Sequence, residues 1–571
     1  MLPMPAARFQ FFPMLRVLII LALIFPAWLS APAGAQAASA QAGAQAVAPS
    51  FAGAGDPDTL ARAILDDMSD EEALAQTFML GWVGAEPSPL IMDWIRQRNI
   101  GGVKIFGWNT ADTRSLAQTV GALQTAALEG PHGIPLFVAT DQEGGLVRHI
   151  KGATSETPGN MAIGASGYPR DAYLSGYYIG RELAVLGVNM NFAPAVDLFT
   201  NRDSTVIGPR AFGSSPVEAG ILGAAFARGQ AAAGIIATAK HYPGHGDTDL
   251  DSHGILPRIS ASFEELWNRE LVPYRLLARE GVPAVMSGHL AFPNTLAASD
   301  PASLSSWFLH DLLREQIGFR GLIITDDLMM NGATMSAGSV SRAAKQALMA
   351  GNDIIMFSKT PGLLDPVWTS LTAAMQEEPG FRERVRDAAL RALKTKLTWL
   401  RGDKAVPYIP DLAKVAAGLP DPEGGAFFLD LAARSVSLIA GEGVFPLDPE
   451  TAGRVLLAGQ YEDFFTIGRR AYPQGVPYWY SIARGEADFR YFARQSDTII
   501  FCAAQPEDLE PLGYIRDMGK RVIVFSVLSP LEAGDIPWVD GALAVYSYSR
   551  ESFIAGFSAI LGRIPFQGKL P

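Results

Sequence analysis

Three histidines, three aspartates and one lysine are concentrated in the fourteen residues KHYPGHGDTDLDSH, from Lys240 to His253. Histidine and aspartate side chains bind metal ions and transfer protons near neutral pH. The spacing of His241 and His245 is that of zinc-binding helices, but a proline and a glycine between them prevent a helix from presenting both on one face. A loop that gathers His241, His245 and His253 with an aspartate around zinc stays open as an alternative.

The end of this stretch, DSH, places Asp251 two residues before His253. In an extended segment, residues i and i+2 project to the same side, so the carboxylate can reach the imidazole. Such a partner orients the histidine ring and raises its basicity. We therefore predict an Asp–His acid/base pair here, with a solvated loop histidine as the alternative.

A second candidate is Asp326, where the apolar run GLIITDDLMM contains two aspartates. A carboxylate at the end of a strand can act as a nucleophile, a general base, a cation ligand or a helix cap, and Asp327 could cap the helix that follows. One carboxylate combined with one acid/base group is what glycoside hydrolysis requires. Trp108, Asp141 and Arg210, near other predicted strand ends, suit the recognition of sugar hydroxyls.

Short apolar runs that alternate with longer helical segments must position these side chains. Eight such repeats predict a (β/α)8 barrel, in which catalytic groups lie at the C-terminal ends of the strands. The predicted strands begin at Thr77, Gly101, Pro135, Val188, Ile236, Ala284, Leu322 and Asp353, and polar residues at their ends are Asp141, Asp197, Lys240, His241, His289, Asp326 and Asp327.

A second, smaller α/β unit follows the barrel. The helical segment RVRDAALRALKTKLTWL closes the barrel, and a Pro/Gly-rich linker comes after it. The stretch AFFLDLAARSVSLIA is predicted to be helical throughout, and the apolar runs after it predict a mostly parallel open sheet without a glycine-rich phosphate-binding motif. The strands of this sheet are predicted to begin at Arg454, Asp497, Arg521 and Gly541.

The N-terminus has the features of an export signal. Arg8 and Arg16 form a positively charged segment before the apolar run VLIILALIFPAWLS, and AGA provides a cleavage site. An uncleaved anchor is the alternative, but the run is shorter than the roughly 20 residues of a membrane span and Pro26 interrupts it. We predict export to the periplasm or the extracellular space without stable membrane insertion after cleavage.

These patterns divide the chain into five segments. They are a signal peptide (1–35), a flexible leader (36–55), a (β/α)8 catalytic domain (56–400), a linker (401–424) and a C-terminal α/β domain (425–571).

Composition excludes several classes of protein. The formal net charge of −12 and the absence of basic runs argue against nucleic acid as a partner. The single cysteine, Cys502, excludes an intramolecular disulfide and a Cys-rich zinc site. We predict no cofactor and no metal.

Six motifs resemble those of one known family, in the order in which the family has them. They are TDQEGGLVRH, NFAPAVD, IGPRAFG, KHYPGHGDTDLDSH, MSGHLAFP and ITDDLMM. The region from about residue 56 to 400 resembles glycoside hydrolase family 3, in its β-N-acetylhexosaminidase branch, and the tail ILGRIPFQGKLP is similar to that family's second domain.

The resemblance implies roles for individual residues. Asp326 matches the nucleophile, His253 the general acid/base and Asp251 its partner. The implied activity is retaining exo-hydrolysis of terminal β-linked N-acetylglucosamine, from peptidoglycan fragments or chitin oligosaccharides, through a covalent glycosyl-enzyme. The residues that match those holding the terminal sugar are Asp141, Arg210, Lys240 and His241.

One residue departs from the family pattern, because Leu146 stands where the family usually has arginine, and Arg148 follows two residues later. The resemblance assigns no catalytic residue to the second domain. Four alternatives remain open: a β-N-acetylglucosaminide phosphorylase, a β-glucosidase-like hydrolase of the same family, a zinc hydrolase and a non-catalytic glycan-binding protein.

Overall fold

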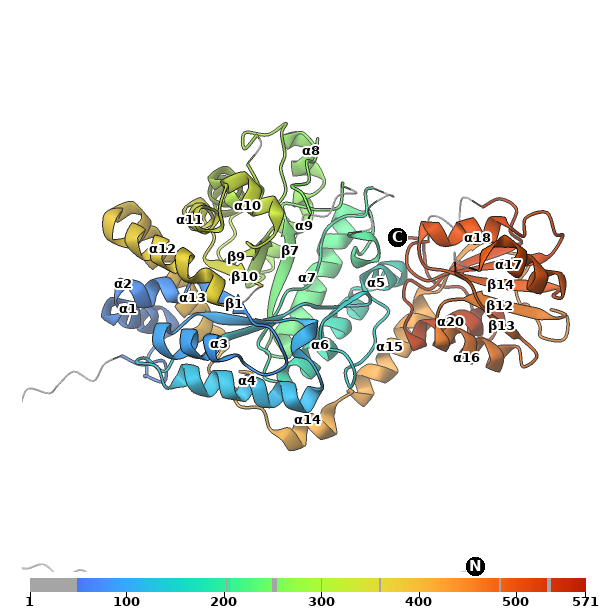
Figure 1. Cartoon of the computed structure of the whole chain (residues 1–571), viewed down its shortest axis with the longest axis horizontal. Helices are drawn as coiled ribbons and strands as arrows, with labels where there is room; N and C mark the ends of the chain where they lie inside the picture. Colours follow the sequence, from blue (N-terminus) through green and yellow to red (C-terminus); the bar gives the residue numbers. More distant parts are fainter. Residues whose placement is uncertain are drawn as a thin grey trace, which may run out of the picture. The chain divides into compact units, whose positions relative to one another are not determined.

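Eight parallel strands close into a barrel in the larger part of the chain (Figure 1). Each predicted barrel strand is present, so the (β/α)8 prediction is confirmed. In the order in which they neighbour one another, the strands are β1 (Phe78–Gly81), β10 (Ile354–Phe357), β9 (Leu322–Asp327), β8 (Ala284–Ser287), β7 (Ile236–Tyr242), β6 (Met190–Asn191), β3 (Phe137–Thr140) and β2 (Gly102–Ile105), which pairs with β1.

The computed structural model describes residues 49–201, 204, 206–248, 254–298, 300–358, 361–481, 484–530 and 536–571. The predicted signal peptide and most of the leader lie outside these ranges. Within them we find no helix with the length and hydropathy of a membrane span. Residues from Ala48 to Pro571 form one compact unit, which includes the barrel and the second sheet.

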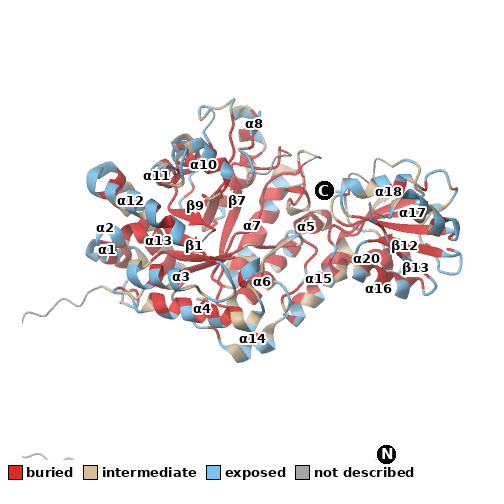
Figure 2. Ribbon diagram, viewed as in Figure 1, coloured by how far each residue is buried: buried red, intermediate tan, exposed pale blue. Residues whose placement is uncertain are grey.

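Helices connect the strands and bury one face against the barrel, while their outer faces are exposed (Figure 2). A capping box begins α2 (Asp70–Ala75), where Ser69 and Glu72 bond to each other's backbone N–H groups. The connecting helices are α3 (Pro89–Asp93), η1 (Trp94–Arg98), α4 (Thr113–Leu128), α5 (Asn160–Ser166), α6 (Pro169–Val185), α7 (Pro216–Ala232), α8 (Phe263–Asn268), α9 (Leu271–Arg279), η5 (Trp307–Gln316), α10 (Asn331–Ala337), α11 (Val340–Ala350) and α12 (Asp365–Glu377).

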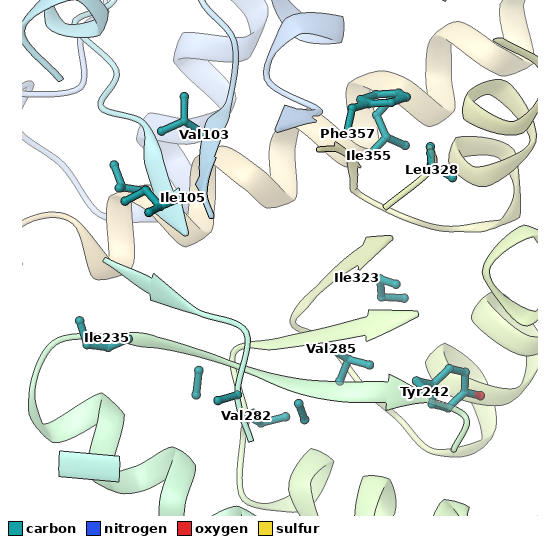
Figure 3. Packing of buried hydrophobic residues seen from close by; sticks show 14 of the residues in the cluster. Val103, Ile105, Ile235, Tyr242, Val282, Val285, Ile323, Leu328, Ile355 and Phe357 are labelled. Carbon is teal, nitrogen blue, oxygen red and sulfur yellow. The ribbon is translucent and has the colours of Figure 1, made fainter. Parts of the chain in front are cut away.

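Alternate strand residues feed two separate cores, as the two-residue period of a strand requires. Inward-facing residues such as Phe137, Leu322 and Ile324 fill the barrel interior. Outward-facing residues such as Val103 and Ile323 pack against the surrounding helices (Figure 3). The interior core continues into α1 (Pro57–Asp67) and α13 (Pro379–Trp399).

The second sheet has six strands in the order β11, β16, β15, β14, β12 and β13, and β11 alone is antiparallel to its neighbour. A mostly parallel open sheet is therefore confirmed. Its strands are β11 (Ser437–Ala440), β16 (Gly541–Ala544), β15 (Arg521–Ser526), β14 (Thr498–Ala503), β12 (Val455–Gly459) and β13 (Val476–Trp479), and its helices are α16 (Glu462–Ala471), α17 (Gly485–Arg494), α18 (Leu509–Gly513) and α20 (Arg550–Ile560).

Two strands of this sheet were not predicted. The stretch AFFLDLAARSVSLIA is not helical throughout: α15 (Pro422–Ser435) ends early, and SLIA forms β11 against β16. Pairing with a neighbouring strand outweighs the helical pattern there. β13 contains Pro477 and is largely exposed, which is typical of an edge strand. The segment 401–424 contains α14 (Leu412–Gly418) and the start of α15.

A buried lysine in α13, Lys396, lies against the interior core of the barrel and affects the stability of the fold. Lys396 is fully buried, and its Nζ donates to Gln76 Oε1 at 2.9 Å and lies 5.0 Å from the centre of the Phe137 ring. Burial holds the pKa of Lys396 well below its usual value. The unfolded chain then binds more protons than the folded one, so this group costs stability below the unfolded lysine pKa of about 10.4.

We expect Lys396→Met to raise the melting temperature by a few degrees at pH 7, because methionine fills the same space without a buried amine. The difference between variant and wild type should narrow as the pH rises toward 10. Lys394→Met, on the same helix but paired with Asp58 at the surface, is the control and should change little. The measurement is thermal unfolding across this pH range. A difference in melting temperature between Lys396→Met and wild type that widens as the pH rises would contradict a lowered pKa for Lys396.

Candidate active site

Alternation along the strands places four charged side chains inside the barrel. In β9, Leu322 and Ile324 belong to the interior core and Ile323 to the outer one, so Asp326 shares the inward face. By the same two-residue alternation, Lys104 of β2, Asp141 directly after β3 and Lys240 of β7 also face inward. All four charged groups lie toward the C-terminal ends of their strands, where barrels carry their active sites.

These side chains line one pocket of about 230 Å³. It brings together five predicted site residues, namely Asp141, Arg210, Lys240, His241 and Asp326. Trp108, which was also predicted to suit sugar recognition, is exposed and does not line this pocket. Most of the charged residues come from β2, β7 and the segments after β3 and β6. The sector from β8 to β10 contributes Asp326, Asp327 and three methionines, Met286, Met330 and Met356.

Lys240 and Lys104 both bind Asp141. Lys240 Nζ forms a close ion pair with Asp141 Oδ1 and lies 2.6 Å from Glu143 Oε1, while Lys104 Nζ lies 2.6 Å from Asp141 Oδ2. Burial alone would raise the pKa of the Asp141 carboxyl, but the two lysines outweigh it and hold the pKa well below its usual range. Asp141 is therefore an anion at neutral pH.

Arg210 forms a bidentate pair with Glu143. Its Nε lies 3.0 Å from Glu143 Oε2, its Nη2 lies 2.8 Å from Oε1, and its Nη1 donates to the Val206 carbonyl at 3.0 Å. Burial favours the neutral form of Glu143, but Arg210 and Lys240 lower its pKa below the usual value. The guanidinium is thereby fixed in one orientation at the pocket wall.

His241 is held by Asp197. Its Nδ1 lies 2.7 Å from Asp197 Oδ2, so Nδ1–H donates and Nε2, which lies 3.3 Å from Arg210 Nη2, is left as the acceptor. Asp197 also accepts the backbone N–H of His245 at 2.7 Å. Burial raises the pKa of Asp197, and His241 more than offsets it, so the carboxyl stays ionised.

His245 differs from its neighbour. Burial, reinforced by His241, lowers its pKa to about 4, so the ring is neutral at pH 7. Neither ring nitrogen has a hydrogen-bond partner among the residues that the structure describes. Both nitrogens of His241 are already engaged by other groups, and within the described part of the chain no group of three or more potential ligands is arranged to hold a metal ion.

Asp326 forms no salt bridge among the described residues, unlike Asp141, and its Oδ1 accepts the N–H of Asp327 at 2.8 Å. Burial raises the pKa of Asp326, but His241 and then His289 bring it below the usual value. An ionised carboxylate that is not neutralised by a direct ion pair can attack an electrophilic carbon.

Asp327 does not cap the following helix, contrary to the prediction. The N-cap of α10 is Met330, which makes no side-chain cap. Asp327 Oδ1 instead accepts the N–H groups of Met329 at 2.9 Å and Ser358 at 3.0 Å, and Oδ2 accepts the Ser358 hydroxyl. Asp327 thereby joins the end of β9 to the segment after β10, and it also lines the edge of the pocket.

Three ionisable residues were missed by the sequence reasoning: Lys104 and His149, which line the pocket, and Glu143, which binds the lining residues Lys240 and Arg210. Lys104 is the one charge in the apolar run GGVKIFG, and Glu143 lies two residues after Asp141 in the hairpin β4 (Gln142–Gly144) to β5 (Val147–Arg148). His149 follows this hairpin with Nδ1 3.3 Å from the Ile105 carbonyl. Burial, then Lys104, lowers the pKa of His149 to about 4.

Arg148 does not replace the arginine that the family has at position 146. Its guanidinium binds Glu156 at 2.8 Å and the Ser155 carbonyl at 3.1 Å, and it is not among the pocket-lining residues. Leu146 lies exposed at the hairpin turn. The predicted acid/base pair, Asp251 and His253, lies outside the described residues.

Comparison with known proteins finds similar sequences and structures. A model of the glycosyl hydrolase family 3 N-terminal domain matches residues 71–391. Beta-hexosaminidase A from Pseudoalteromonas piscicida is 28% identical over 550 residues, which cover 85% of this chain and 90% of that protein.

Two solved structures are also similar. A family 3 β-N-acetylglucosaminidase from Paenibacillus sp. str. FPU-7 is 29% identical with a TM-score of 0.80, over 88% of this chain and 98% of that one. A fungal multi-domain family 3 β-N-acetylglucosaminidase is 28% identical with a TM-score of 0.81 over 88% of this chain, which spans 60% of the fungal one. Because the family model covers more than half of the sequence and includes every strand of the barrel, this chain belongs to glycosyl hydrolase family 3.

Proposed function

We propose that this chain is a retaining exo-β-N-acetylhexosaminidase that releases terminal β-linked N-acetylglucosamine. The observation that carries the proposal is Asp326, an ionised carboxylate on the inward face of β9 that opens into a pocket lined by fixed charges. The names of the similar proteins support N-acetylglucosamine as the terminal sugar.

In the proposed cycle, Asp326 attacks the anomeric carbon of the bound sugar while a general acid protonates the departing oxygen. We assign that acid to His253, with Asp251 as its partner. The glycosyl–Asp326 ester is then hydrolysed by water that His253 deprotonates, which restores the β configuration through two inversions. With an imidazole as the acid/base, Asp326 is the carboxylate that reacts with the sugar: it must be ionised to attack, and it is released as the carboxylate when the ester is hydrolysed.

The charged sector of the pocket is assigned to sugar recognition. Asp141, Arg210, Lys240 and His241 are held by ion pairs in one arrangement, so donors and acceptors are oriented before a sugar arrives. The small pocket supports an exo enzyme that takes one terminal sugar. We further propose that residues 1–35 export the enzyme and that peptidoglycan fragments or chitin oligosaccharides supply its substrate.

Asp326→Ala should reduce kcat by at least about 1,000-fold with an aryl β-N-acetylglucosaminide, because the glycosyl-enzyme can no longer form. Asp311→Ala is the control, since Asp311 is exposed on η5 and pairs only with His310 there. Turnover by Asp326→Ala close to the wild-type rate would show that Asp326 is not the nucleophile. A wild-type protein without turnover of this substrate would contradict the proposed activity.

Lys240→Met should move the acid limb of the kcat/KM profile to higher pH. Lys240 lowers the pKa values of Asp141, Glu143 and Asp326, so removal of its charge lets these carboxyls protonate at a higher pH. The pH dependence of kcat/KM should be recorded for Lys240→Met and for Lys345→Met, whose lysine pairs with Glu378 and does not line the pocket. An acid limb that stays in place would show that Lys240 does not control these carboxylates.

Product analysis separates hydrolysis from phosphorolysis. We expect chitobiose and muropeptide fragments to yield free N-acetylglucosamine at the same rate with and without phosphate, and the first product to be the β anomer by NMR. A glycosyl phosphate that forms only when phosphate is present would identify a phosphorylase. A higher rate on β-glucosides than on β-N-acetylglucosaminides would favour the β-glucosidase-like alternative.

A further inference from the structure

A small buried cluster joins the second sheet to the pocket wall of the barrel. From the second sheet it contains Ala544, at the end of β16, and Tyr546, which is 2% exposed. From the barrel it contains Ile207 and Ala211, which flank Arg210, together with three residues of α5. The segment that carries Arg210 therefore packs against the second sheet.

Tyr546 has a backbone conformation that few residues adopt. Its φ of 63° lies in the left-handed region, which is unfavourable for a residue with a bulky side chain. Its hydroxyl lies 2.6 Å from Ser437 Oγ, so the ring is fixed at its far end as well. Such a conformation persists only where the surrounding structure determines it, and it is common where geometry serves function.

Ser547, the next residue, is connected to Glu143, which forms an ion pair with Arg210. Ser547 Oγ donates to the Thr157 carbonyl at 3.4 Å, and Thr157 Oγ1 accepts the N–H of Gly145 at 2.9 Å. Gly145 lies in the turn of the hairpin that carries Glu143. Contacts from two consecutive residues that follow β16 in the second domain therefore lead to Arg210 on one path and to Glu143 on the other.

Helix α5 adds a third connection between the same parts. Asn160 at its start donates through Nδ2 to the Arg210 carbonyl at 2.8 Å. Near its end, the Ala165 carbonyl accepts the N–H of Lys569 at 2.9 Å. The backbone at Arg210 is thus held by a helix that packs on Tyr546 and is also bound by the C-terminal tail.

We propose that Tyr546 and Ser547 are positioning residues that set the geometry of the Arg210–Glu143 pair, so that the second domain controls sugar binding without touching the sugar. The proposal rests on the proposed function, in which this pocket binds the terminal sugar. A contact that only docked the two sheets together would have no reason to converge on both members of one ion pair.

The test is a double-mutant cycle in the full-length chain. Tyr546→Ala should lower kcat/KM for an aryl β-N-acetylglucosaminide by about 10- to 100-fold, mostly through KM, because small displacements of a binding group are costly. In an Arg210→Lys background the same substitution should add less than about twofold, since the group it positions is already altered. Tyr546→Phe keeps the ring and should retain most of the activity.

Tyr472→Ala is the matched control. Tyr472 is also a 2% exposed tyrosine of the second domain with a bonded hydroxyl, but it packs in a core made only of that domain. It should lower the melting temperature without changing KM. Equal losses of kcat/KM for Tyr546→Ala with and without Arg210→Lys, or a pattern identical to that of Tyr472→Ala, would overturn the proposal.

A second measurement does not depend on catalysis. Hydrogen exchange followed by mass spectrometry should show faster exchange in residues 206–211 and 142–147 for Tyr546→Ala but not for Tyr472→Ala. Ser547→Ala, a milder change, should accelerate exchange in 142–147 and provides the same test if Tyr546→Ala does not fold. Unchanged exchange in both segments of Tyr546→Ala would contradict the positioning role. If the wild type is inactive but Tyr546→Ala still changes exchange in these segments, only the proposed function is contradicted.

Discussion

The pocket depends on a chain of buried charges of alternating sign, Lys104, Asp141, Lys240, Glu143 and Arg210, in which each member contacts the next. A single buried ion of this kind would be strongly destabilising, and removal of one partner from a buried pair typically costs about 3–5 kcal/mol. The members lie on different strands and loops, so they can neutralise one another only when the barrel is closed. Closure of the barrel and formation of this chain of ion pairs therefore depend on each other.

Sequence periodicity predicted the barrel but not this chain of charges. Apolar runs of four to eight residues mark strands, and Asp326 and Asp141 were identified because such runs end on them. Glu143 and Lys104 could not be identified in the same way, because their partners Lys240 and Asp141 are distant in sequence and no local pattern encodes the pairing. β11 was missed for a related reason: it owes its conformation to β16, while its own residues continue a helical pattern.

Asp326 and Asp327 illustrate how one residue of register separates two functions. The two acids are adjacent and both line the pocket, yet strand alternation places Asp326 on the inward face of β9 and engages Asp327 with Ser358. Their environments move the two pKa values apart: the histidines near Asp326 bring its pKa below the usual value, while burial raises that of Asp327. The pattern TDD alone does not distinguish the two environments; the position of Asp326 on the inward face of β9 is what supports the proposed nucleophile.

Strand order also constrains how a sugar can lie in the pocket. In the closed order, three strands separate β9 from β3 in either direction, so Asp326 and Asp141 stand on opposite sides of the barrel. A sugar ring whose anomeric carbon faces Asp326 must present its far hydroxyls to Asp141 and the lysines beside it. Under the proposed assignment, the linkage to be cut then lies beside Asp326, away from the fixed charges. A chain extended beyond those far hydroxyls would meet the ion pairs, so the wall proposed to bind the terminal sugar would also end the binding site there.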